Sequence, residues 1–204
     1  IVLVATSNIV PNGLYKDGLQ RARFLPAIEL LNLHTEVVCV DSGIDYRLRE
    51  LEQAELYYCP ACEKADQLMR EQMERLAPEP ATEDVGLEIE GRFIRARMRA
   101  DDVVWFDFLA ICDGPRSQND YIEIAREFHA VLISAIPKFE AKDDQARRFI
   151  NLVDEFYDHG VKLILSADVP LLELYTGGRL SFEFERTTSR LLEMQSTEYL
   201  GRMH

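Results

Sequence analysis

The sequence has no long apolar run, no excess of positive charge and few cysteines, and each absence excludes a class of protein. None of its apolar runs approaches the ~20 residues that a helix needs to span a bilayer. Its 23 basic and 36 acidic residues give a net charge of −13, which repels nucleic-acid phosphates and anionic lipids. Four cysteines do not form a disulfide framework for a chain of 204 residues. We therefore expect a cytoplasmic protein with no membrane segment and no nucleic-acid partner.

The composition is that of an ordinary globular protein. Hydrophobic residues make up 47% and charged residues 29% of the chain, and the length allows one large domain or two small ones. The first residues, Ile1 to Val4, already form an apolar run with no initiator methionine. The sequence is therefore expected to be a fragment of a longer protein.

Apolar runs alternate with amphipathic segments, which predicts an α/β fold. Strands at 131–136 and 161–165 flank a helix at 143–157, and this βαβ unit predicts two parallel strands. Further strands are expected at 2–6, 35–40, 91–99 and 103–108, and helices at 19–31 (limited or bent by Pro26), 45–55, 64–77, 117–128 and 186–200. We expect a mostly parallel sheet with flanking helices and a small antiparallel element around 87–108. A linker at 78–84 divides the prediction into domains at 1–78 and 79–204.

The first segment carries the best candidates for chemistry. Asn8 follows an apolar strand, at the sheet edge where α/β proteins bind ligands, and Arg21 and Arg23 begin the next helix. An amide can orient a water molecule, and a guanidinium can offset charge that develops on a phosphate. The alternative is that these are ordinary residues of a turn and of a helix surface.

One internal echo connects this segment with a later one. Leu14 and Tyr15 follow Asn8 at the same distances at which Leu174 and Tyr175 follow Asp168. We interpret the echo as two strand ends with similar turn chemistry, and a true duplication is the alternative.

Several long strings of the sequence are specific enough to indicate a family. They are VATSNIVPNGLYKDGLQRARFLPAIELL, DYRLRELEQAELYY, WFDFLAICDGPRSQNDYIEIAREFHAVLISAIP, ARRFINLVDEFYDHGVKLILSA and FEFERTTSRLLEMQSTEYL. These strings closely resemble the ZapE family of AAA+ ATPases and its mitochondrial relatives. They cover nearly the whole chain except about 59–90. The resemblance implies an AAA+-type P-loop NTPase fold.

The resemblance also implies roles for particular residues. Asn8 falls where the family has its sensor-1 asparagine, and Arg21 looks like the arginine finger, with Arg23 as the alternative. Because such a finger acts on the nucleotide of a neighbouring subunit, a ring-forming homo-oligomer is implied. Arg147 and Arg148 are candidates for a sensor-2-like phosphate contact at a helix N-terminus. The alternative for this pair is one exposed arginine and one paired with Asp143 or Asp144.

The sequence departs from the family pattern in one respect. Hydrolysis of ATP needs a glycine-rich loop with its lysine, and an acidic strand end that holds Mg²⁺. No GxxxxGK[ST] string occurs in the 204 residues. The acidic run LVDEFYD at 152–158 lies in the expected helix, and we interpret it as a solvated face. This chain alone is therefore expected to be inactive, although the resemblance implies ATP and Mg²⁺ for the intact protein.

A second candidate motif is Cys59-Pro60-Ala61-Cys62. Such a pair can be a redox couple or half of a zinc site. A zinc site needs two more ligands, and no second CxxC string occurs. We favour structural or incidental cysteines.

The function implied by the resemblance is ATP hydrolysis coupled to remodelling of a protein partner, namely the FtsZ division ring. The alternative is a scaffold or interaction module that does not hydrolyse nucleotide. The two differ in whether the intact protein contains a phosphate-binding loop.

Overall fold

The computed structural model divides the chain into two compact units, Ile1–Ile44 and Asp45–His204, which are described separately. It describes residues 4–5, 7, 10–14, 21–38, 51, 55–77, 79–140, 143–202 and 204. The two domains expected from the sequence, 1–78 and 79–204, stay a prediction.

The second unit is built on a six-stranded sheet with the order β1-β6-β5-β4-β3-β2. The strands are β1 (Tyr57–Tyr58), β2 (Thr82–Ile89), β3 (Arg92–Ala100), β4 (Val103–Asp107), β5 (Ala130–Ile136) and β6 (Lys162–Ala167). The pairs β1–β6, β6–β5 and β5–β4 are parallel, whereas β4–β3 and β3–β2 are antiparallel. The fold is therefore α/β with a mostly parallel sheet, as predicted.

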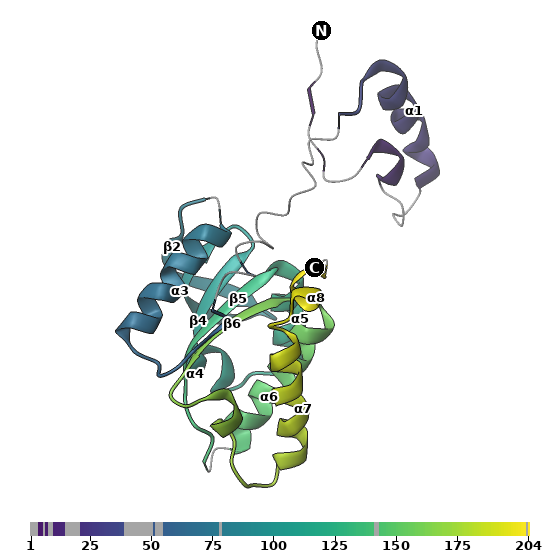
Figure 1. Cartoon of the computed structure of the whole chain (residues 1–204). Coiled ribbons are helices and arrows are strands. Elements are labelled where there is room, and N and C mark those ends of the chain that lie inside the picture. The colour runs from purple at the N-terminus through teal and green to yellow at the C-terminus, as the bar shows by residue number, and fades with distance from the viewer. Residues whose placement is uncertain are drawn as a thin grey trace. The chain divides into compact units, whose positions relative to one another are not determined.

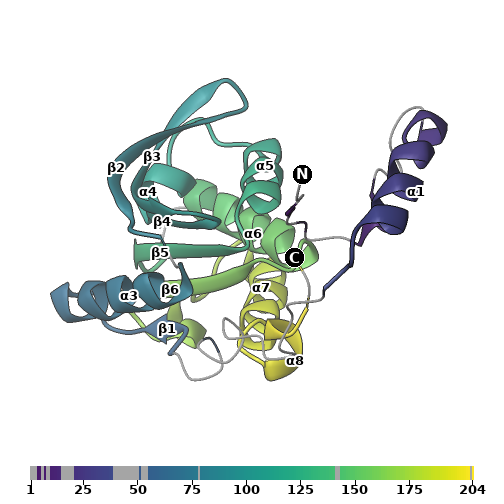
Figure 2. The same ribbon diagram turned by 90° about the horizontal axis from the view of Figure 1, so that it is seen from above.

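Both faces of the central strands are buried, because most of their residues are apolar. In β5, Val131 and Ile133 join the core on one face, while Ala130 and Leu132 join the core on the other. The helices of the second unit are α3 (Glu63–Leu76), α4 (Phe108–Cys112), α5 (Gln118–Glu127), α6 (Asp143–Asp158), α7 (Ser181–Glu193) and α8 (Thr197–Leu200). Helix α3 covers one face, and α5 and α6 cover the other (Figures 1 and 2).

The central βαβ prediction is confirmed. Strands β5 and β6 are parallel and are joined by α6, whose apolar positions pack into the core. Helices α3 and α5 lie where 64–77 and 117–128 were expected, and β3 and β4 form the expected antiparallel pair.

Two predictions in the second unit are wrong. Glu83 and Asp84 belong to strand β2 and not to a linker, because this segment pairs with β3, and Leu87 and Ile89 further along the strand are buried. The last helix is not continuous over 186–200. Helix α7 begins earlier, at Ser181, and a turn separates it from α8, whose N-cap Ser196 accepts a hydrogen bond from the Tyr199 backbone N–H.

In the first unit the described elements are the 3₁₀ helices η1 (Pro11–Gly13) and η2 (Arg21–Arg23) and helix α1 (Leu25–His34). Pro26 lies in the first turn of α1, where its missing N–H is tolerated, so it does not bend a helix as expected. The strand expected at 35–40 is absent from 35–38, and Val4 and Ala5 of the expected strand 2–6 are also not in a strand. A strand needs a neighbour to pair with, and the described residues of this unit include none. The helix expected at 45–55 lies mostly outside the described residues.

A buried lysine fixes the C-terminal segment to the sheet. Lys162 is 4% exposed, and its ammonium group donates to the carbonyl oxygens of Gly160 (2.8 Å), Tyr199 (3.3 Å) and Arg202 (2.7 Å). The same group lies 5.2 Å from the centre of the Tyr199 ring. Lys162 thus caps the end of α8 from the first position of β6.

We expect Lys162→Met to lower the free energy of unfolding by about 2 kcal/mol, because three carbonyl oxygens, two of them in buried hydrogen bonds, lose a charged donor. Methionine keeps most of the apolar length of lysine. Urea denaturation of this chain measures the effect, with Lys138→Met as the control, since Lys138 makes a single long ion pair with Glu140 at 3.8 Å. Equal denaturation midpoints for the two variants would contradict this role.

Candidate functional site

The candidate arginine finger is held by the turn that follows Asn8. Pro11–Gly13 form the 3₁₀ helix η1, and Arg21 begins the 3₁₀ helix η2. The Nη2 of Arg21 donates to the backbone oxygen of Asn12 at 2.9 Å. Asn32, on α1, donates from Nδ2 to Oδ1 of the same Asn12 at 2.8 Å. The turn, η2 and α1 are thus tied together through one residue.

The two arginines of η2 differ in their surroundings. Arg21 is half-buried and fixed by its bond to Asn12, whereas Arg23 is exposed and forms no ion pair with a described residue. Asn8 lies outside the described residues, so the structure does not report its side chain. The roles of Asn8, Arg21 and Arg23 therefore stay predictions, and the anchoring of Arg21 is the new observation.

Arg147 and Arg148 are on α6 in the second unit. Arg147 is exposed and Arg148 is half-buried, and within the described part of the chain neither forms an ion pair. The positive charge of Arg148 is close enough to Cys112 to oppose, in part, the rise that burial produces in the pKa of that thiol. Arg148 is therefore near Cys112 of α4, whereas Arg147 is exposed, and the sensor-2-like role of the pair stays a prediction.

The acidic run of α6 is an interhelical contact and not a solvated face. Asp154 is hydrogen-bonded to Arg186 and, at 2.6 Å, to Arg190, both on α7. Asp158 is 3.6 Å from Arg190. The guanidinium of Arg190 also lies 4.7 Å from the centre of the Tyr157 ring. The interpretation as a solvated face was wrong because the arginines that pair with these carboxylates come about thirty residues later.

A polar cluster that the sequence analysis did not single out lies at the carboxyl edge of the parallel strands. Arg97 of β3 donates to Asp66 of α3 and to Ser134 of β5, both at 2.8 Å, and is 3.5 Å from Asp107 at the end of β4. Its guanidinium lies 4.5 Å from the centre of the Trp105 ring. One guanidinium contacts carboxylates of two different elements, so the cluster fixes α3 to the sheet. Its only sequence signal was the alternation of basic and apolar residues in β3.

The string DGPRSQND has a structural role. Arg92 of β3 donates from Nη2 to both carboxylate oxygens of Asp120, at 2.6 and 2.8 Å, and Asp120 is fully buried. The backbone N–H of Ser117 donates to the same carboxylate at 2.5 Å, which forms a capping box at the start of α5. Asp120 therefore joins the β2–β3 hairpin to α5.

Cys59 and Cys62 are exposed free thiols between β1 and α3. Desolvation, and then the charges of Glu173 and Asp168, raise the pKa of the Cys59 thiol, which disfavours the reactive thiolate. The described part of the chain contains no group of three or more His, Cys, Asp or Glu side chains that could hold a metal ion. Nor does any helix in that part have the length and apolar character to cross a membrane.

The family model of AFG1-like ATPases matches residues 1–203. The chain belongs to the AFG1-like ATPase family. The six-stranded, mostly parallel sheet with flanking helices is consistent with the P-loop NTPase type of fold in this family.

Relatives of this AFG1-like chain include a bacterial and a vertebrate protein. It is 47% identical to the cell division protein ZapE of Escherichia coli K12 over 205 residues, which is 100% of the chain and 55% of that protein. It is 34% identical to lactation elevated protein 1 homolog B of Danio rerio over 235 residues, which is 98% of the chain and 47% of that protein. No solved structure matches the chain. The chain thus spans about half the length of these relatives.

Proposed function

We propose that the intact protein is an ATPase that couples ATP hydrolysis to remodelling of a protein partner in cell division. Membership of the AFG1-like ATPase family supports the hydrolysis, and the likeness to a cell division protein supports the process. The FtsZ division ring is the proposed partner, and the cytoplasm is the proposed compartment. The negative net charge of −13 supports a protein and not a nucleic acid as the substrate.

In this proposal Asn8 senses the γ-phosphate or orients the attacking water, and Arg21 acts on the nucleotide of a neighbouring subunit in a homo-oligomer. The observation that carries the role of Arg21 is its hydrogen bond to Asn12. This bond fixes the guanidinium against the turn that directly follows Asn8. Arg23 is the alternative finger, and Arg147 and Arg148 are proposed sensor-2-like residues.

The phosphate-binding loop is proposed to lie in the part of the protein that corresponds to the remaining length of the relatives. The described residues do not provide a carboxylate cluster for Mg²⁺, so no residue of this chain is assigned to that ion. The proposed contribution of this chain to catalysis is therefore confined to sensing and to stabilising charge on the nucleotide.

We expect the intact protein to release phosphate from ATP and the 204-residue chain alone to show no release above background. Without a phosphate loop, ATP lacks its main ligands. A coupled phosphate assay on both proteins at equal concentration measures this, and adding FtsZ polymers tests whether turnover depends on the partner. A chain that hydrolyses ATP by itself would contradict the assignment, and an inactive intact protein would favour the scaffold alternative.

A further inference from the structure

Several residues of the first unit are identical to residues that lie 160 positions later, in the second unit. The residue pairs that are identical at this offset are Leu3/Leu163, Leu14/Leu174, Tyr15/Tyr175, Gly18/Gly178, Phe24/Phe184 and Leu31/Leu191. The offset also relates the 3₁₀ helices η1 and η3 (Leu171–Glu173), whose N-cap backbone angles are φ −60°, ψ 150° and φ −54°, ψ 151°. Each turn is followed by a helix, α1 or α7. The echo therefore extends to three-dimensional structure.

The two segments differ where the turn faces the helix. In the first unit, Asn12 of the turn and Asn32 of α1 are joined by a hydrogen bond. The residues at the same positions in the second unit are Leu172 and Leu192, which cannot form one. These leucines are 74% and 53% exposed, so they are not buried against each other. The polar bridge of the first unit is replaced in the second by two exposed leucines that line an open groove.

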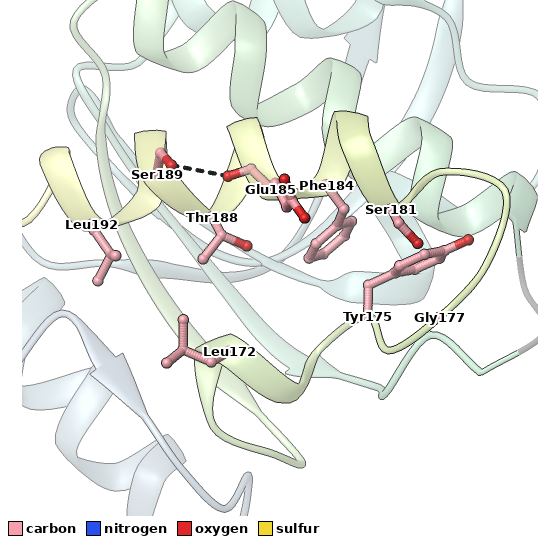
Figure 3. Close-up of a pocket in the computed structure, with 9 residues that line it drawn as sticks. All are labelled: Leu172, Tyr175, Gly177, Ser181, Phe184, Glu185, Thr188, Ser189 and Leu192. Atoms are coloured by element: carbon pink, nitrogen blue, oxygen red, sulfur yellow. Dashed lines mark hydrogen bonds between the residues drawn. The ribbon is translucent and has the colours of Figure 1, made fainter.

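This groove has a volume of about 660 Å³ and lies between η3 and α7. We call it the α7 groove, and its lining includes Leu172, Tyr175, Phe184, Glu185, Thr188 and Leu192. Figure 3 shows Leu172 opposite the helix, with Leu192 near one end of the groove and Tyr175 near the other. Its helical wall from Ser181 to Leu192 is about 17 Å long, at 1.5 Å per residue. That length fits about three turns of a second helix.

The groove has a mixed lining, in which one carboxylate lies beside the two exposed leucines. Glu185 is the charged residue in its lining, which contains no lysine or arginine, and it forms no ion pair with a described residue. The two arginines of α7 face the other way, since Arg186 and Arg190 both bind Asp154 of α6. Helix α7 thus directs its positive charge toward α6 and a carboxylate toward the groove. A partner that buries the leucines needs a basic residue beside its apolar stripe.

We propose that the α7 groove binds a basic amphipathic helix of a partner protein. Apolar side chains at i, i+3, i+4 and i+7 of that helix contact Leu172 and Leu192, and a flanking lysine or arginine pairs with Glu185. The inference rests on the proposed function in that it gives the protein partner a docking surface. It does not depend on the nucleotide, so binding and hydrolysis can fail separately.

The test uses a fluorescein-labelled 15-residue helical peptide with leucines at i, i+3, i+4 and i+7 and lysines beside them. Fluorescence anisotropy measures its binding to this chain and to the L172N/L192N variant, which restores the asparagine pair of the first unit. We expect at least tenfold weaker binding to the variant and unchanged binding to Leu109→Asn, an equally exposed leucine on α4. Glu185→Lys should reverse the preference toward a peptide with glutamates in place of lysines.

Several results would overturn the proposal. One is equal binding of the lysine and glutamate peptides, and another is an equal loss of binding in L109N and L172N/L192N. Absence of binding by the lysine peptide would do so as well. If the wild-type chain forms dimers in sedimentation that L172N/L192N abolishes, the groove is an interface between copies and not a partner site. Phosphate release by the intact L172N/L192N protein without partner is expected to be normal, which separates docking from catalysis.

Discussion

Arg21→Ala is expected to lower ATP turnover by the intact protein about a thousandfold while leaving its affinity for ATP within a few-fold of the wild type. An arginine that meets the γ-phosphate across a subunit boundary acts mainly on charge that develops in the transition state. Arg21 suits this role because its hydrogen bond to Asn12 fixes one edge of the guanidinium. Arg21→Lys should be almost as impaired, since an ammonium cannot present the planar fork of arginine.

The measurements are steady-state phosphate release and binding of a fluorescent ATP analogue. Arg23→Ala is the matched control, because Arg23 lies on the same 3₁₀ helix and is exposed. Mixing Arg21→Ala with a variant whose phosphate loop is inactivated should restore part of the activity if the finger acts between subunits. Full activity in Arg21→Ala with loss in Arg23→Ala would transfer the role to Arg23. Absence of rescue at every mixing ratio would favour a monomeric mechanism.

The second large effect concerns the stability of the fold, and it depends on the ion pair between Arg92 of the β2–β3 hairpin and Asp120 of α5. Arg92→Met is expected to lower the free energy of unfolding by about 3 kcal/mol, because it leaves the fully buried Asp120 carboxylate without its counter-ion. Asp120 would keep its bond from the Ser117 backbone N–H, which does not neutralise the charge. Denaturant unfolding of this chain measures the loss.

Arg95→Met is the control for this prediction. Arg95 lies on the same strand, but its ion pair with Asp84 is exposed on both sides, so its removal should change stability little. The double variant R92M/D120N should be more stable than Arg92→Met alone, because it removes the stranded charge. Additive losses in that double-mutant cycle would show that Arg92 acts through packing and not through Asp120.

The sequence predicted the elements whose signals are local. Strands β5 and β6 consist mainly of apolar residues, and α6 has a clear helical period, so the βαβ unit was predicted correctly. Strand β2 was missed because Glu83 and Asp84 are charged, exposed residues that follow two prolines, which makes the segment resemble a linker. Its pairing partner, β3, supplies the backbone hydrogen bonds that such a segment cannot form by itself.

The candidate site was predictable only in its residue types. Asn8 and the two arginines after it indicated phosphate chemistry, but the bond from Arg21 to Asn12 joins residues nine positions apart in an irregular segment. No periodicity encodes such a contact. The partners of Asp154 were hidden for a similar reason, since Arg186 and Arg190 lie on another helix. Asn8 lies outside the described residues, so its place at the edge of a sheet stays a prediction.

Helix α7 has one side in the hydrophobic core and another side that lines the α7 groove. Phe184 and Leu191 are buried in the core, whereas Thr188 and Leu192 line the groove on the outside. A molecule that occupies the groove therefore contacts a helix whose other side is part of the hydrophobic core. The melting temperature of this chain should consequently rise with the concentration of a ligand that binds in the groove. At a ligand concentration a hundredfold above Kd, binding stabilises the folded state by about 2.7 kcal/mol. Heat resistance would then report occupancy without any label.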